Sequence, residues 1–168
     1  MSTQHLTGGA VVVPRDGGDH LHFLNHLATV KVAGSASGSL SVVEFTAPRG
    51  FGPPLHRHRD EDELFFVIEG EMTAWFGDQT LQAATGACFL LPHGEPHTFQ
   101  IVSDTARLLT VAAKTGNPAT FDRMVSALGV PTTVPTLPEP GPIDPEEVGR
   151  VCAEYGIDIV GPPPAPLV

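Results

Sequence analysis

Short apolar segments that alternate with polar residues follow one another along most of the chain. Alternation with a period of two is typical of strands, and strands that recur every 8–12 residues between turns predict an all-β sandwich or barrel. Glycines and prolines punctuate these segments rather than forming one block. The expected strands cover residues 10–13, 27–33, 39–47, 63–70, 71–77, 79–84, 86–92, 97–103 and 106–113.

The segments ELFFVIEG (63–70) and EMTAWFG (71–77) together predict a hairpin with its turn at Gly70. The first of these strands is apolar on both faces. We therefore expect the barrel interior to cover one face and a second sheet or subunit to cover the other. The segment GSASG (34–38) is expected to be a loop.

The pattern changes near residue 117, where two helices are expected. In the first, Asn117 is the expected N-cap, Pro118 the first helical residue and Gly129 the C-terminal stop. In the second, Asp144 is the expected cap and Pro145 the first residue. The apolar stripes of the two helices predict packing faces; they consist of Phe121, Met124, Val125, Leu128, Val148, Val151, Cys152 and Tyr155.

Composition places the chain among single globular domains. It has 168 residues, of which 41% are hydrophobic. The net charge of −10 argues against nucleic acid and anionic membranes as partners, because both require basic patches. Cys88 and Cys152 lie far apart and are expected to be small buried side chains in a reducing compartment. With neither a signal-peptide pattern nor an apolar run of ~18 residues, a cytoplasmic location is expected.

Metal-ligand chemistry is concentrated in the stretch GFGPPLHRHRDEDELFFVIEG (50–70). His56 and His58 point the same way if this segment is extended, and Glu63 and His97 begin later strands. Three imidazoles and one carboxylate suit a transition metal and leave positions open for a substrate. The remaining acidic residues, 60–62, are expected to form a solvated loop.

The other histidines carry weaker signals. His20, His22 and His26 form a cluster for which surface or packing roles are favoured over a second metal site. His93 is expected at a turn and His5 in a terminal tail.

The chain resembles the cupin superfamily, whose two motifs are G-x5-HxH-x4-E-x6-G and G-x5-P-x-G-x2-H-x3-N. The first is complete here, and the second departs only at Ile101, where asparagine is common. The matching residues are Gly50, His56, His58, Glu63, Gly70, Gly86, Pro92, Gly94 and His97.

The resemblance implies a conical cupin β-barrel (a double-stranded β-helix, or jelly roll) with C-terminal helices. The barrel is expected to span residues 1–115, with its motifs at 50–70 and 86–101. A helical, proline-rich extension (116–168) would pack on the barrel or on the partner of a homodimer. The implied cofactor is one divalent transition metal (Fe, Ni, Co, Mn, Cu or Zn), and its implied ligands are His56, His58, Glu63 and His97.

Alternation along the strands also predicts a substrate pocket. If Glu63 and His97 face inward, every second residue after them should face inward too. Two further aromatic residues are expected near the mouth. The predicted lining is Phe45, Phe51, Phe65, Val67, Phe99 and Ile101.

Beyond the motifs, the chain is similar to small single-domain cupins that resemble quercetin 2,3-dioxygenase. This implies oxidative cleavage of a flavonol-like or other enolisable aromatic by O2, with Glu63 as both ligand and catalytic base if an apolar pocket raises its pKa. Two alternatives stay open: a non-redox metal-dependent cyclase or isomerase of the polyketide type, and a cupin that only binds a small molecule.

Overall fold

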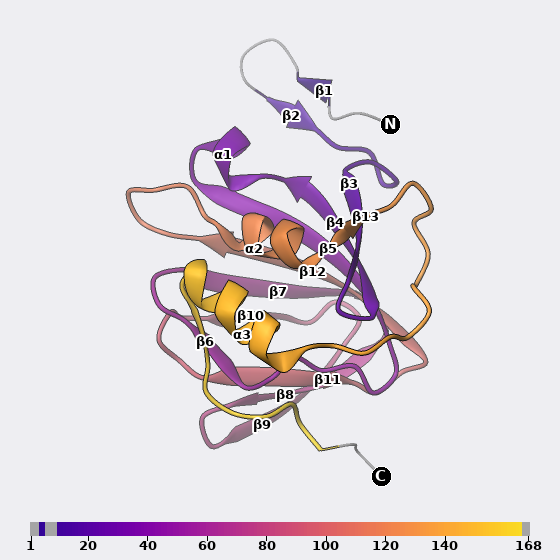
Figure 1. Cartoon of the computed structure of the whole chain (residues 1–168), viewed down its shortest axis with the longest axis vertical. Helices are drawn as coiled ribbons and strands as arrows, with labels where there is room; N and C mark the ends of the chain where they lie inside the picture. The colour runs from indigo at the N-terminus through magenta and orange to yellow at the C-terminus, as the bar shows by residue number, and fades with distance from the viewer. Residues whose placement is uncertain (1–3, 6–9, 166–168) are drawn as a thin grey trace.

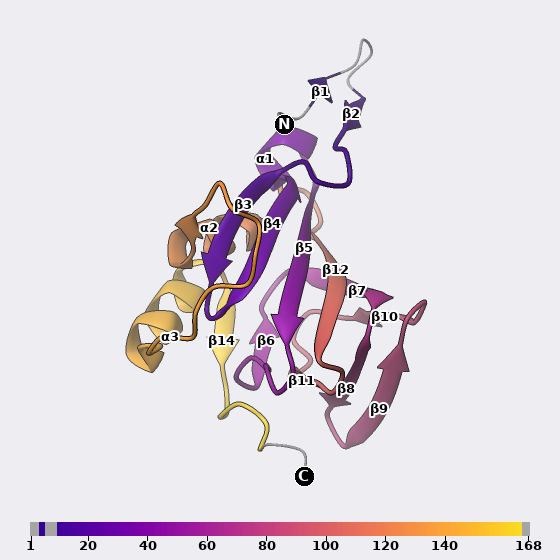
Figure 2. The same ribbon diagram turned by 90° about the vertical axis from the view of Figure 1, so that its right-hand side faces the viewer.

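The computed structural model describes residues 4–5 and 10–165 and contains two antiparallel sheets (Figure 1). The larger sheet has the order β10-β7-β12-β5-β4-β3-β13, and the smaller has the order β14-β6-β11-β8-β9. A separate pair, β1-β2, projects from one end of the molecule (Figure 2). The bounds are β1 Gln4–His5, β2 Val11–Val12, β3 Asp19–Phe23, β4 His26–Val32, α1 Gly34–Ser37, β5 Leu40–Pro48, β6 His56–His58, β7 Asp62–Glu69, β8 Glu71–Phe76, β9 Gln79–Ala84, β10 Cys88–Leu91, β11 His97–Ile101, β12 Thr105–Ala113, α2 Phe121–Leu128, β13 Val130–Pro131, α3 Pro145–Glu154 and β14 Ile157–Ile159.

The predicted fold class is confirmed, since the chain is mostly β with two antiparallel sheets and a few short helices. Throughout the described ranges, every helix is too short or too polar to cross a lipid bilayer. The division between a barrel at 1–115 and an extension at 116–168 stays a prediction.

Two apolar clusters form the core. One lies between the two sheets and includes Val67 and Leu108 from the larger sheet and Met72 and Ile101 from the smaller. The other packs α2 and α3 against the larger sheet, with Phe121 of α2 beside Phe45 of β5. Figure 2 shows the two helices along one side of the sheets.

The predicted hairpin over residues 63–77 is wrong. β7 pairs with β10 and β12 in the larger sheet, whereas β8 pairs with β9 and β11 in the smaller. The chain changes sheets at Gly70, whose φ of 89° suits glycine, and a Cβ there would lie 2.6 Å from the Thr105 carbonyl oxygen. Alternation identifies strands but does not name their partners. The outer face of β7 is also only partly covered, because Phe66 is 39% exposed.

The second predicted helix is confirmed at its N-terminus. The Asp144 side chain accepts hydrogen bonds from the backbone N–H groups of Glu146 and Glu147, and Pro145 is the first helical residue. The first helix starts later than predicted, with Thr120 instead of Asn117 at its N-cap. Just before it, the Ala119 N–H donates to the carbonyl of Ser39 and so is not available to the helix. A short helix, α1, replaces the loop expected at 34–38.

Cysteine burial was predicted correctly at one position only. Cys152 is buried on α3, but Cys88 is exposed. Cys88 lies on β10, the edge strand of the larger sheet, directly opposite the exposed Phe66 on the outer face.

Candidate metal centre

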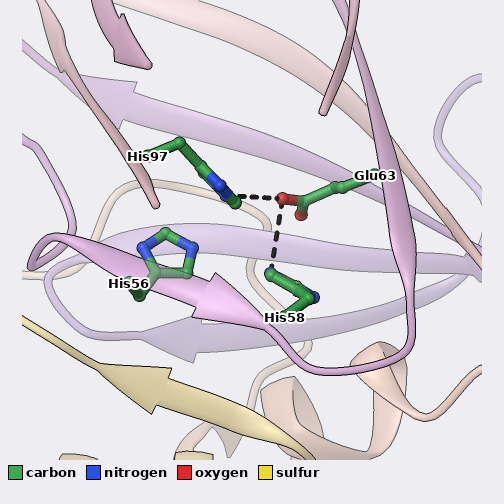
Figure 3. Close-up of side chains that lie close together, drawn as sticks. All are labelled: His56, His58, Glu63 and His97. Atoms are coloured by element: carbon green, nitrogen blue, oxygen red, sulfur yellow. Dashed lines mark hydrogen bonds and ion pairs between the residues drawn. The ribbon is translucent and has the colours of Figure 1, made fainter. Parts of the chain in front are cut away.

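The two sheets bring all four predicted ligands together at one place (Figure 3). His56 and His58 come from β6 and His97 from β11, in the smaller sheet, while Glu63 comes from β7 in the larger one. His97 lies directly opposite His56 in the strand register. One nitrogen or carboxylate oxygen from each residue lies within 4.8 Å of those from the other three.

Backbone carbonyls fix two of the imidazole rings. Nδ1 of His56 donates to the Pro54 carbonyl oxygen at 2.8 Å, and Nδ1 of His97 donates to the Glu95 carbonyl oxygen at 2.9 Å. A carbonyl oxygen can only accept, so the proton of each neutral ring is on Nδ1. When each ring is neutral, its Nε2 atom presents a lone pair, which is the arrangement that metal-bound histidines use.

The distances within the cluster suit a shared cation. The Glu63 Oε2 atom lies 3.2 Å from Nε2 of His97 and 3.4 Å from Nε2 of His58. Two ligands at right angles around a metal with ~2.1 Å bonds lie ~3.0 Å apart. In addition, neither ring nitrogen of the buried His58 has a hydrogen-bond partner among the described residues. Because an unpartnered buried polar group is costly, these observations fit a bound transition metal.

At His56 and His58 the electrostatics favour the neutral ring that a metal requires. Burial, together with the neighbouring His97 and His58, lowers the pKa of His56 to about 3. Burial likewise lowers the pKa of His58. For His97 burial acts in the same direction, but the hydrogen bond and charge of Glu63 raise its pKa above the usual value.

The pKa of Glu63 is shifted down, whereas a raised pKa was expected. Burial does act to raise it, but the charges of His58 and His97 outweigh burial and lower it to about 2. The apolar surroundings therefore do not turn Glu63 into a neutral acid. It is an anionic carboxylate at neutral pH, which is the form that could serve as a metal ligand.

The acidic residues 60–62 beside the cluster were predicted to form a solvated loop, and this is wrong for one of them. Glu61 is only 2% exposed, and it accepts hydrogen bonds from the backbone N–H and the hydroxyl of Thr120. Asp62 is half-exposed and accepts hydrogen bonds from His93. The burial of Glu61 could have been predicted from strand alternation. Glu61 precedes Glu63 by two residues, so the two side chains share the inward face.

A cavity of about 540 Å³ opens beside the cluster, and both Glu63 and His56 reach its wall. His58, Glu63 and His97 are at most 2% exposed, whereas His56 is partly exposed. Among the described residues, the lining contains no lysine or arginine. Four of the six predicted pocket residues line it: Phe45, Phe51, Phe65 and Phe99.

The other two predicted pocket residues do not line this cavity. Val67 and Ile101 face inward, but they are 0% and 1% exposed and pack with Met72 and Leu108 in the core between the sheets. Each lies one inward-facing position further along its strand than a residue that does line the cavity. The cavity ends before it reaches them because apolar side chains fill that depth.

Sequence reasoning missed two contributors to the cavity wall. His26 lines it, although the prediction favoured a general surface or packing role. The C-terminal segment also lines it, through Ile157, Ile159 and residues 161–163. β14 pairs with β6, so this segment flanks the strand that carries His56 and His58.

Comparison with known proteins identifies a cupin domain at residues 43–112. The chain is 29% identical over 115 residues to quercetin 2,3-dioxygenase of Bacillus subtilis (strain 168), which is 68% of this chain and 33% of that protein. An uncharacterized protein of Streptomyces coelicolor is 35% identical over 51 residues, 30% of this chain and 49% of that protein. The chain thus spans half or less of the lengths of these relatives.

A solved structure supports the fold. It is that of a candidate ethanolamine utilization protein from Salmonella typhimurium, with a TM-score of 0.56 and 21% identity. The match covers 68% of this chain and 94% of that one.

Proposed function

The chain belongs to the cupin domain proteins, and from this premise we propose that it is a metal-dependent dioxygenase of the quercetin 2,3-dioxygenase type. Its substrate would be a flavonol-like or other enolisable aromatic, cleaved oxidatively with O2. The observation that carries the proposal is a cluster of three histidines and one glutamate that opens onto an apolar cavity walled by phenylalanines.

The four clustered side chains would hold one divalent metal. His56, His58 and His97 would supply neutral nitrogens and Glu63 an anionic oxygen. When bound, the metal would polarise a substrate oxygen and, if redox-active, allow reaction with O2.

Glu63 has a second role in this proposal. It is ionised and reaches the cavity wall, so it can accept a hydrogen bond or a proton from a substrate hydroxyl at the cluster. Its low pKa makes it a weak base. The proton would therefore move only from a hydroxyl that has already become acidic.

The shape and chemistry of the cavity suggest the class of substrate. A volume of about 540 Å³ lies in the range of small-molecule sites. Phe45, Phe51, Phe65 and Phe99 offer faces and edges to a flat ring. Among the described residues, no lysine or arginine lines the cavity, and this disfavours polyanionic substrates. We also propose a homodimer in which the partner covers the partly exposed outer face at Phe66.

The test is to purify the protein without chelator, measure its metal content, and follow O2 consumption with quercetin after reconstitution with each metal. Oxygen uptake that matches loss of the flavonol absorbance is the expected result. Loss of both in His58→Ala, with a folded protein, would tie turnover to the cluster.

A non-redox cyclase or isomerase is the second candidate, because the same ligand set suits zinc, which has no redox chemistry. Stoichiometric metal with product formation but no oxygen uptake would favour it. Binding without turnover of any tested aromatic would instead indicate a binding protein.

A further inference from the structure

His26 is a second polar group in the cavity, apart from the metal cluster. It is 3% exposed and lies among aromatic rings, with centroid distances of 4.1 Å to Phe51, 5.0 Å to Phe23 and 5.2 Å to Phe45. It also forms part of the cavity wall. Burial lowers its pKa to about 4, so the ring is neutral near pH 7.

One ring nitrogen of His26 is left without a protein partner. Nδ1 lies 3.2 Å from the Leu24 carbonyl oxygen and, because that oxygen only accepts, Nδ1 carries the proton. Nε2 then bears a lone pair, and within the described ranges it accepts no hydrogen bond from the protein. Because His26 lies at the cavity wall, this unpaired acceptor is available to a hydrogen-bond donor on a molecule bound in the cavity.

The backbone holds this ring in a defined place. Leu24 and Asn25 form the two-residue turn between β3 and β4 with φ values of 47° and 67°. This left-handed conformation is unfavourable for leucine. The turn is fixed by the Asn25 side chain, which exchanges two hydrogen bonds of 2.9 Å with the backbone of Gly141.

A series of ring contacts links His26 to the metal cluster through two phenylalanines. From His26 the centroids step 5.2 Å to Phe45, 6.1 Å to Phe121 and 5.8 Å to His58. His26 is not among the four residues whose ligand atoms lie within 4.8 Å of one another, so it is not a fifth ligand of the cluster. A group that meets its Nε2 atom must belong to a different part of the substrate from the oxygen at the cluster.

We propose that His26 Nε2 accepts a hydrogen bond from a second hydroxyl of the substrate, so that the cavity selects polyhydroxylated aromatics. This inference rests on the proposed function and adds to it a specificity-determining residue. A carbonyl or ether oxygen at this position would meet another acceptor and would be disfavoured. A plain ring would leave this nitrogen without the hydrogen bond, which disfavours it relative to a hydroxylated ring.

The experiment compares two ligands that differ in ring hydroxyls, 3-hydroxyflavone and quercetin. Dissociation constants are measured by fluorescence with the zinc-loaded full chain under nitrogen, so that no turnover is required. The wild type should bind quercetin about tenfold more tightly, the value of one hydrogen bond. His26→Phe should bind both ligands alike, and His93→Phe, the same change at an exposed position outside the cavity, should keep the preference.

His26→Gln guards against an effect of ring shape, because its amide oxygen restores an acceptor and should recover part of the preference. A preference that survives in His26→Phe would overturn the inference, as would equal binding by the wild type. If neither His26→Phe nor His26→Gln binds any ligand, and their unfolding midpoints are unchanged, His26 has a purely steric role. That result would also overturn the inference. If the preference depends on His26 but no oxygen is consumed with quercetin, only the proposed dioxygenase activity fails.

Discussion

The neutrality of His26 makes a quantitative prediction about stability in acid. The pKa of His26 is about 4 in the fold, compared with 6.5 for an ordinary histidine, because burial disfavours the charged ring. As the pH falls below 6.5, the unfolded chain takes up the proton first, so the stability contributed by a neutral His26 is complete above pH 6.5 and is lost as the pH falls toward 4. Between pH 7.5 and 4.5 the loss is about 2.5 kcal/mol.

The assay is urea unfolding of the chelated protein at these two pH values, followed by the fluorescence of Trp75, the single tryptophan of the chain. Wild type and His26→Phe are compared through the change in unfolding free energy between pH 7.5 and 4.5. This comparison cancels any effect of phenylalanine that does not depend on pH. The buried cluster histidines lose stability in acid in both proteins, so they cancel as well.

The drop in stability should be about 2.5 kcal/mol smaller in His26→Phe than in the wild type. Equal drops in wild type and His26→Phe would mean that the ring titrates normally in the fold. The argument that His26 is a neutral acceptor at the wall of an apolar cavity would then fail.

Three further results are expected. Glu63→Ala should lower metal affinity more than ~100-fold and abolish turnover. Asp62→Ala, on the opposite face of β7, should leave metal affinity and turnover within about threefold of the wild type. Equal losses of metal content and activity in the two variants would contradict the strand register. Ending the chain before Ile157 removes β14 from its place beside β6 and should weaken metal binding about tenfold, measured by competition with a chromophoric chelator. Unchanged affinity would show that β14 does not position the histidines of β6. Glu61→Ala should lower the free energy of unfolding by about 2 kcal/mol, because the Thr120 N–H and hydroxyl lose a buried acceptor, and a loss below about 0.5 kcal/mol in urea would count against this role.

Local periodicity predicted the strands and the residues that gather at the candidate centre. The spacing of two between His56 and His58 places both rings on one face, and the burial of Glu63 and Phe65 follows the same rule along β7. These are properties of a single strand. They do not depend on which other strand lies beside it.

Properties that depend on pairing and depth were not predictable in this way. The apolar pattern of 63–77 fits a hairpin as well as two strands in different sheets, and the choice depends on long-range partners. Alternation places Phe65 and Val67 on the same face, yet only Phe65 meets the cavity, because the side chains of the smaller sheet fill the space beside Val67. Which face a residue occupies is a local property, but its depth is set by packing from the other sheet.

The division of the site along the chain bears on how far function can be carried over from relatives. All four clustered residues lie within the cupin domain at 43–112, so the chemistry of the centre can be common to proteins that share that domain. His26 and the segment 157–163 lie outside it, yet both form the wall of the cavity. Because selectivity depends on the wall that a substrate touches, these flanking segments can change the substrate without altering the metal ligands. Substitutions at His26 should therefore alter the choice of aromatic while the metal content stays the same, and substitutions at Glu63 should affect both.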